Sequence, residues 1–117
     1  MGKLEIQVLG ELRVIADGQE LTLPTSKKTR ALLAYLAITA RPHRRDRLCE
    51  LLWDVTDDPR AALRWSLSKL RPIVNESERE CLLADRERVQ LDIEHIHVDL
   101  HALIEELEQP DVSLGAR

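Results

Sequence analysis

Apolar and polar residues alternate in three short runs at the start of the chain. The runs are 4–9 (LEIQVL), 11–16 (ELRVIA) and 19–23 (QELTL), with Gly10 after the first and Asp17-Gly18 after the second. Alternation with a period of two predicts half-buried strands, and an Asp-Gly pair between two such runs predicts a hairpin. We therefore expect a three-stranded antiparallel sheet at this end of the chain.

The apolar spacing then becomes that of two helices. Leu32, Leu33, Leu36 and Ala37 predict a first helix, which begins after a Thr25 or Ser26 cap and ends near Ala40. A second, short helix is expected from about Arg45 to Trp53. Its apolar stripe is expected at Leu48, Leu51 and Leu52, flanked by Cys49 and Trp53.

A third helix is expected to start near Arg60. Asp57 or Asp58 caps it, and Pro59 occupies its first position. The stripe that faces the core is predicted to be Leu63, Leu67, Leu70 and Val74. Pro72 lacks a backbone donor, so we expect the helix to end or kink there.

The rest of the chain predicts a loop, a hairpin and a final helix. Residues 75–80 are polar, 81–92 (CLLADRERVQLD) predict two strands with their turn inside 85–88, and 100–107 predict a helix capped by Asp99. Two short helices followed by a hairpin are the arrangement of a helix-turn-helix with a wing. The expected fold is an α+β winged helix-turn-helix.

Length and composition limit which class of protein this can be. The chain has 117 residues, of which 44% are hydrophobic and 32% are charged, which suits one domain with its own core. Cys49 and Cys81 show neither a disulfide framework nor zinc-site spacing, so reduced thiols are expected. The chain offers no signal peptide and no membrane-spanning run, which predicts a cytoplasmic protein.

Charge is distributed unevenly. The formal net charge is -4, yet residues 24–72 carry eleven cations and five anions, and residues 73–117 carry four cations and twelve anions. A basic middle segment is where an anionic partner would bind. An enzyme is not expected, because the four glycines form no phosphate-binding loop and no nucleophile with a base is recognisable.

Five segments together resemble one family of regulators. They are LEIQVLGELRV at the start, LPTSKKTRALLAYLA in the first helix, RDRLCELLW in the second, ALRWSLSKLR in the third and LLADRERVQL in the hairpin. In this order they resemble the N-terminal DNA-binding domain of the streptomycete antibiotic regulatory protein family, a branch of the OmpR/PhoB-type winged helix. The resemblance covers roughly the first ninety residues.

The resemblance implies a sequence-specific regulator of transcription that binds double-stranded DNA, with the third helix in the major groove. It implies an activator that binds direct repeats as two protomers, with RNA polymerase as a possible partner. Residues 1–93 would form the DNA-binding domain, and residues 94–117 a linker and the start of a helical activation domain. No cofactor or metal is expected.

Ten residues are expected to contact DNA: Arg44, Arg45, Arg60, Arg64, Trp65, Ser68, Lys69, Arg71, Arg86 and Arg88. From Arg60 to Arg71 there is no acid, and a helix with uncompensated cations commonly meets phosphate. Arg64, Trp65, Ser68 and Lys69 project furthest from the leucine stripe and are candidates for base contacts. The alternatives are a solvated surface helix and, for Trp65, stacking on a sugar or covering a neighbouring helix.

Three other groups of charged residues each have two possible interpretations. A phosphate bridging the starts of the first two helices would explain the basic clusters 27–30 and 44–47, and a solvated basic turn would explain them equally simply. Arg86 and Arg88 either contact DNA or neutralise the acids beside them. The acidic loop 54–58 either faces RNA polymerase or only caps a helix.

Three histidines and an aspartate alternate with apolar residues near the end of the chain. They are His95, His97, Asp99 and His101. This pattern is typical of the wet face of a half-buried strand or linker, and it favours a metal site far less. The strongly acidic stretch 73–117 leaves a second function open, a winged helix that docks a regulatory protein without binding DNA.

Overall fold

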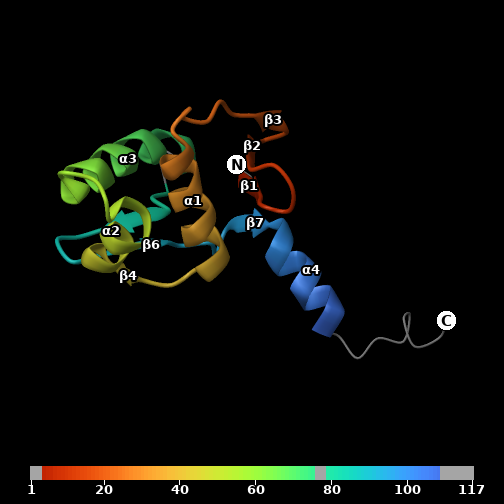
Figure 1. Cartoon of the computed structure of the whole chain (residues 1–117). Coiled ribbons are helices and arrows are strands. Elements are labelled where there is room, and N and C mark those ends of the chain that lie inside the picture. The colour runs from red at the N-terminus through yellow and green to blue at the C-terminus, as the bar shows by residue number, and fades with distance from the viewer. Residues whose placement is uncertain (1–3, 76–78, 109–117) are drawn as a thin grey trace, which may run out of the picture.

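The computed structural model describes residues 4–75 and 79–108. They form, in order, β1 (Leu4–Gln7), β2 (Arg13–Ala16), β3 (Gln19–Glu20), α1 (Lys27–Thr39), β4 (His43–Arg44), α2 (Arg45–Trp53), α3 (Pro59–Val74), β5 (Leu82–Ala84), β6 (Arg88–Leu91), β7 (Ile96–Val98) and α4 (Asp99–Glu108). Figure 1 shows the three helices α1–α3 gathered beside β4–β6, with β1–β3 and α4 on the other side of α1. The mixed α and β class is confirmed, but the number of elements is larger than expected.

The N-terminal sheet has four strands in the order β3-β2-β1-β7. The predicted hairpin is present, and its turn residues Asp17 and Gly18 both have positive φ, at 51° and 85°. A half-buried strand near His97 was one of the two interpretations of the sequence, but its place in this sheet was not predicted: β7 pairs parallel with β1, with Leu4 opposite Ile96. The alternating pattern around His97 is therefore a half-buried strand over Ile96–Val98, with both terminal residues buried.

α1 begins and ends where its end signals predict. The Ser26 hydroxyl accepts a hydrogen bond from the Thr29 N–H at 3.2 Å, so Ser26 rather than Thr25 is the cap. Ala40 ends the helix in the left-handed conformation, with φ 52°. The predicted apolar positions Leu32, Leu33, Leu36 and Ala37 are all buried.

α2 has the predicted bounds but a different buried face. Leu48, Cys49 and Trp53 are buried, whereas the side chain of Leu51 is 49% exposed. At about 100° per residue, positions 48, 49, 52 and 53 share one arc of the helix and position 51 falls outside it. Assigning the stripe by leucines alone was therefore wrong at Leu51.

α3 passes through Pro72 and ends two residues later, so the predicted end was wrong. Pro72 is exposed and lies in the last turn, where its missing N–H removes a single bond, the one to the carbonyl of residue 68. The Asn75 N–H donates to the Arg71 carbonyl at 2.8 Å, and Val74 is fully buried. Burial of Val74 beside Leu70 stabilises the turn that follows the proline. At the other end, Asp58 is the cap, and its carboxylate accepts from the Ala61 N–H at 3.1 Å.

The predicted hairpin consists of β5 and β6, and an additional strand joins it. β4 pairs antiparallel with β6, which gives a three-stranded sheet in the order β4-β6-β5. β4 has only two residues, and its partners lie 44 or more positions later in the chain, so no local pattern predicts it. The consequence is that the start of α2 is attached to the wing.

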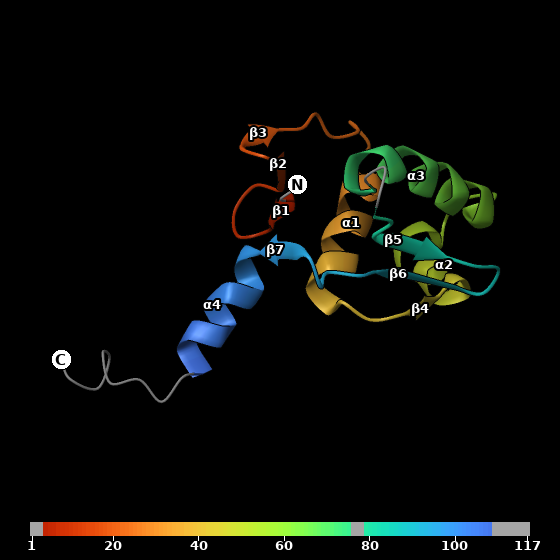
Figure 2. The ribbon, with the colours of Figure 1, turned by 180° about the vertical axis from the view of Figure 1, so that it is seen from behind.

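α4 begins at Asp99 itself, so Asp99 is its first residue rather than a preceding cap. The Asp99 carboxylate accepts hydrogen bonds from the N–H groups of Val8 (2.8 Å) and Leu9 (3.2 Å), and the His101 ring Nε2 contacts the Ala37 carbonyl at 3.0 Å. Beyond these anchors α4 projects away from the other elements, as both views show (Figures 1 and 2). None of its residues is buried. Residues 109–117, the rest of the expected linker, lie outside the described part of the chain.

One core joins both sheets and the helices α1–α3. Its fully buried members include Ile6, Leu36, Leu48, Leu67 and Leu91. Both cysteines lie in this core, and burial raises the pKa of the Cys49 thiol. Within 4–75 and 79–108, no three His, Cys, Asp or Glu side chains are grouped so that they could hold a metal ion. In the same ranges no helix has the length and apolarity needed to cross a membrane.

Candidate nucleic-acid interface

The outward face of α3 carries four of the predicted residues. All four are exposed: Trp65, Ser68 and Lys69 lie opposite the buried stripe of Leu63, Leu67, Leu70 and Val74, and Arg64 lies at the edge of the same face. The Ser68 hydroxyl donates to the Trp65 carbonyl at 2.6 Å. The Lys69 ammonium lies 5.3 Å from the centroid of the Trp65 ring, within range of a cation–π interaction. This face therefore presents a guanidinium, an indole, a hydroxyl and an ammonium together.

Four arginines from three elements line one hollow. Its lining residues are Arg45, Arg60, Leu63, Arg64, Asp85 and Arg86. Arg45 opens α2, Arg60 and Arg64 come from the first two turns of α3, and Arg86 lies at the tip of the wing. The hollow holds a single carboxylate against four cations, so an anion would be attracted to it. All four of these arginines are among those predicted from the sequence.

Main-chain and side-chain contacts of Arg45 hold the wing tip against α2. The Arg45 N–H donates to the Glu87 carbonyl at 2.8 Å, and its side-chain Nε donates to the Asp85 carbonyl at 2.7 Å. The Asp85 carboxylate closes the turn by accepting from the N–H groups of Glu87 (2.8 Å) and Arg88 (2.7 Å). These hydrogen bonds, the one from Arg88 first, hold the pKa of the Asp85 carboxyl below its usual value.

Arg60 has an acidic partner, contrary to the expectation that the cations of this helix are uncompensated. Its guanidinium forms an ion pair with the carboxylate of Asp46 on α2, and both side chains are more than half exposed. The acid is absent from residues 60–71 but comes from the neighbouring helix. Arg60 is therefore a half-neutralised member of the hollow, and Arg64 lies beside it on the next turn of α3.

A buried pair of hydroxyl groups fixes α3 against α1. The Thr29 Oγ1 and Ser66 Oγ atoms lie 2.8 Å apart, and both residues are almost completely buried. Ser66 lies on the core side of the helix, directly after Trp65 in the chain. The bond satisfies both polar groups inside the core, and it sets the rotation of α3 and thus the direction in which Arg64 and Trp65 point.

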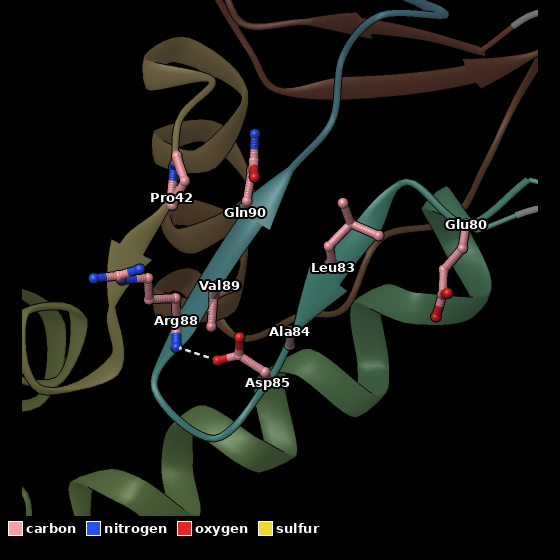
Figure 3. A pocket seen from close by; sticks show the side chains of 8 residues that line it. All are labelled: Pro42, Glu80, Leu83, Ala84, Asp85, Arg88, Val89 and Gln90. Carbon is pink, nitrogen blue, oxygen red and sulfur yellow. Dashed lines mark hydrogen bonds between the residues drawn. The ribbon is translucent and has the colours of Figure 1, made fainter.

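Arg44 and Arg88 lie apart from the four-arginine hollow. They are opposite each other in the β4–β6 ladder, where side chains of a cross-strand pair share one face. Figure 3 shows a second hollow on this sheet, lined by Arg88 together with Glu80 and Asp85 among others, with the Arg88 side chain extending across β4. The structure thus divides the predicted wing cations, Arg86 on one side and Arg88 on another. Arg71 lies at the far end of α3, half-buried.

The starts of α1 and α2 do not share a phosphate. Figures 1 and 2 show α1 starting beside α3, whereas α2 starts beside β4 at the opposite end of α1. Arg30 lines a hollow with Glu11 and Glu20, and Arg47 forms an exposed ion pair with Glu50 at 3.7 Å. A local acid therefore compensates part of the second cluster, and because the two helix starts lie at opposite ends of α1, one phosphate does not bridge them.

The acidic loop between α2 and α3 has one clear structural role. Asp58 caps α3, as described above, and Asp54 ends α2 in a helical conformation. Val55 at the loop tip is 85% exposed. The capping interpretation is confirmed for Asp58, and a contact of this loop with RNA polymerase stays a prediction.

Three residues important to this interface were not predicted from the sequence. Asp46 pairs with Arg60, Thr29 bonds to Ser66, and Asp85 organises the wing turn. For Asp85 a signal existed, because an aspartate two or three residues before the main-chain N–H groups of a tight turn commonly accepts from them. The other two contacts join residues 14 and 37 positions apart in the chain, and no pattern in either segment indicates them.

Comparison with known proteins gives one informative likeness. No family model matches the chain, and no curated protein matches its sequence. Among solved structures it is similar to Mycobacterium tuberculosis EmbR in complex with a low-affinity phosphopeptide, with a TM-score of 0.77 and 27% sequence identity. The match covers 91% of this chain and 29% of that one. The chain thus spans less than a third of the length of the solved protein.

The likeness bears on the kind of domain. EmbR is a regulator of the streptomycete antibiotic regulatory protein type. The similarity supports a winged-helix domain like those of that family, and it supports a role as a domain of a transcription regulator. The neighbour is a regulator and not an enzyme. The phosphopeptide in that complex is a ligand of EmbR.

Proposed function

We propose that the domain binds double-stranded DNA sequence-specifically and regulates transcription, reading the major groove with α3. The observation that carries the proposal is the hollow in which Arg45, Arg60, Arg64 and Arg86 meet. Four cations from two helices and a wing meet there, and the two acids beside them, Asp85 in the lining and Asp46 on Arg60, leave an excess of positive charge that favours a phosphate backbone. The likeness to EmbR supports a role as a domain of a regulator.

Roles follow from where each side chain lies. Arg64 stands at the boundary between the hollow and the outward face of α3, so it reaches a base edge, and a bidentate contact with guanine discriminates by about 1–3 kcal/mol. Lys69 and Ser68 lie one turn further along the same face. The Ser68 hydroxyl already donates within the helix, so it is left as an acceptor for a base donor.

The remaining cations hold the backbone. The side chains of Arg45 and Arg86 contact phosphates beside the recognition helix. Those of Arg44 and Arg88 contact a phosphate or the minor groove beyond the wing. Arg60 binds phosphate while it keeps or exchanges Asp46, because an exposed ion pair contributes little and yields readily to a second anion. Arg71 contacts the backbone at the far end of α3.

Selection of operators tests the proposal. The purified chain is used to enrich duplexes from a random library, and the affinity for the winner is measured across a salt series. We expect an enriched motif, a steep fall of affinity with salt, and a loss of about tenfold or more in affinity for Arg64→Ala. Absence of any enriched motif together with flat salt dependence would reject DNA binding.

A matched control separates a specific contact from loss of charge. Arg13 is an exposed arginine of β2, outside the hollow and on the other side of α1. Arg13→Ala removes the same charge as Arg64→Ala, and we expect it to leave operator affinity within about twofold, because a distant exposed charge is screened by salt. Equal losses for both variants would show that only the net charge matters.

Several finer points belong to the same proposal. By resemblance, two copies bind direct repeats about one helical turn apart, the regulator activates transcription, and it works in the cytoplasm where its operator and RNA polymerase are found. Footprinting on the selected operator tests the first point, because two protected half-sites in the same orientation are expected. A single protected site would limit the proposal to one copy.

A second function is favoured by α4. This helix carries exposed Leu103, Ile104 and Leu107 beside Glu105, Glu106 and Glu108. An exposed apolar face with acids is typical of a surface that contacts another protein. The domain would then dock a regulatory partner without binding DNA, and the salt series above distinguishes the two functions.

A further inference from the structure

Trp65 is a large apolar side chain that lies half-exposed on the outward face of α3 and outside the core. The chain has two tryptophans, of which Trp53 is 6% exposed in the core and Trp65 is 50% exposed on the outward face of α3. Among the described residues of α3, Trp65 is the one large hydrophobic residue that is exposed. A tryptophan placed there leaves much apolar area in water, which folding alone does not favour.

The neighbours of Trp65 hold its ring in a defined position. Lys69 lies one turn further along, with its ammonium 5.3 Å from the ring centroid, and Arg64 precedes it in the chain. The Thr29–Ser66 bond fixes the rotation of the helix at the residue next to Trp65. The indole is therefore presented on the same face as the cations and not against a neighbouring helix.

The chemistry around the ring selects its target. Arg64 and Lys69 require that the surface meeting this face be anionic, and the proposed ligand is duplex DNA. In the major groove each base presents hydrogen-bonding groups, and thymine alone among the four bases also presents a methyl group. An indole has wide apolar faces and one donor, so it gains most from contact with that methyl group.

We infer that Trp65 is a specificity-determining residue that selects thymine through its C5 methyl group, beside a base that Arg64 reads. The inference rests on the proposed function and adds to it the identity of one feature of the operator. It also accounts for the position of Lys69, whose ammonium lies near the indole on the same outward face.

Deoxyuridine provides the test, because it keeps every hydrogen-bonding group of thymine and lacks only the methyl group. Each thymine of the selected operator is replaced in turn, and the dissociation constant is measured with the whole chain by fluorescence anisotropy. At the contacted thymine we expect wild-type affinity to fall roughly fourfold, which is the effect of leaving one methyl group unburied. Trp65→Ala is expected to bind the thymine and deoxyuridine operators equally.

The structure offers a matched control. Leu51 on α2 is 49% exposed, nearly the same as Trp65, and it lies outside the outward face of α3. Leu51→Ala should keep the full sensitivity to deoxyuridine. Trp65→Gln serves beside Trp65→Ala, and because the ring is exposed both variants are expected to fold, as checked by circular dichroism and urea unfolding.

The outcomes separate this inference from the function on which it rests. An operator that depends on Arg64 but binds equally well with deoxyuridine at every thymine, or that contains no thymine beneath α3, overturns the role of Trp65 and leaves DNA binding in place. Sensitivity to deoxyuridine that persists in Trp65→Ala overturns it as well. Failure to enrich any operator rejects the proposed function and this inference with it.

Discussion

His43 is a buried histidine whose neighbours define its protonation state. The Thr39 hydroxyl donates to the Tyr35 carbonyl at 2.7 Å, so toward the His43 ring it acts as acceptor, and the His43 Nε2 atom, 2.7 Å away, carries the proton. The Tyr35 and His43 ring centroids lie 4.8 Å apart. Burial first, and the charge of Arg41 second, lower the pKa of His43. Its neutral form is therefore the one that the fold accommodates.

This burial makes stability depend on pH. With a folded pKa below the unfolded value of about 6.5, the unfolded chain binds more protons between the two values. We expect the free energy of unfolding to be highest, as far as His43 contributes, above about pH 6.5. It should fall as the pH is lowered from there toward the folded pKa of His43. Urea unfolding at about pH 7.5 and 5.5 measures the difference.

The variant His43→Gln assigns the effect. It removes the titrating ring, so the stability difference between the two pH values should shrink, whereas His95→Gln, at an exposed position, should leave it unchanged. An identical pH dependence in wild type and His43→Gln would show that another group is responsible.

Leu67 and Arg64 lie three residues apart on α3, and the first is buried in the core whereas the second is exposed at its edge. Leu67 is buried in the core, so Leu67→Ala should lower the free energy of unfolding by about 2–5 kcal/mol. Arg64 is exposed, so Arg64→Ala should change stability by no more than about 0.5 kcal/mol. Urea unfolding of both variants checks this, and a strongly destabilised Arg64→Ala would mean that the arginine supports the fold.

The cap of α3 allows the effects of two adjacent aspartates on stability to be compared. Asp58 accepts the Ala61 N–H, and Asp57 beside it is exposed and precedes the cap. We expect Asp58→Ala to lower the free energy of unfolding by about 0.5–2 kcal/mol. Asp57→Ala should stay within about 0.5 kcal/mol. Thermal or urea unfolding of the two variants measures the difference, and equal losses of stability would contradict the assignment of Asp58 as the cap.

Elements that depend on local signals could be predicted from the sequence. α1, α2 and the β5–β6 hairpin follow from periodicity and turn residues, and the start of α3 follows from an Asp-Pro pair. The end of α3 could not, because burial of Val74 outweighs the proline signal at Pro72. β4 and the pairing of β7 with β1 could not be predicted, because β4 has two residues and both strands pair with partners far away in the chain.

The candidate interface shows the same limit. Charge and helical spacing indicate the outward face of α3, but the meeting of Arg45 with Arg86 depends on β4, which has no sequence signal. The pairing of Arg60 with Asp46 likewise depends on how α2 packs against α3. Sequence reasoning finds which residues point outward, and tertiary packing decides which of them meet.

Asp99, near the end of the described chain, is hydrogen-bonded to the segment that follows β1 near its start. Its carboxylate receives the N–H groups of Val8 and Leu9, just beyond β1. We expect Asp99→Ala to speed hydrogen exchange at these two amides by about tenfold, because charged acceptors contribute roughly 1.5–3 kcal/mol per hydrogen bond. Glu106→Ala, on the exposed part of α4, should leave both amides unchanged. Unchanged exchange in Asp99→Ala would show that these two hydrogen bonds do not protect the amides.

The parallel pairing of β1 with β7 also has a consequence for how the domain comes into being. Leu4 pairs with Ile96, so during synthesis β1 leaves the ribosome long before its parallel neighbour β7 has been made. Closing so long a loop is entropically costly and slows folding relative to the local hairpin of β1 and β2. Until then the β1 edge is open to pairing with other chains, the period in which aggregation is most easily started. The sheet β3-β2-β1-β7 is thus completed only after α1–α3 and the wing have been made, although three of its four strands precede all of them in the chain.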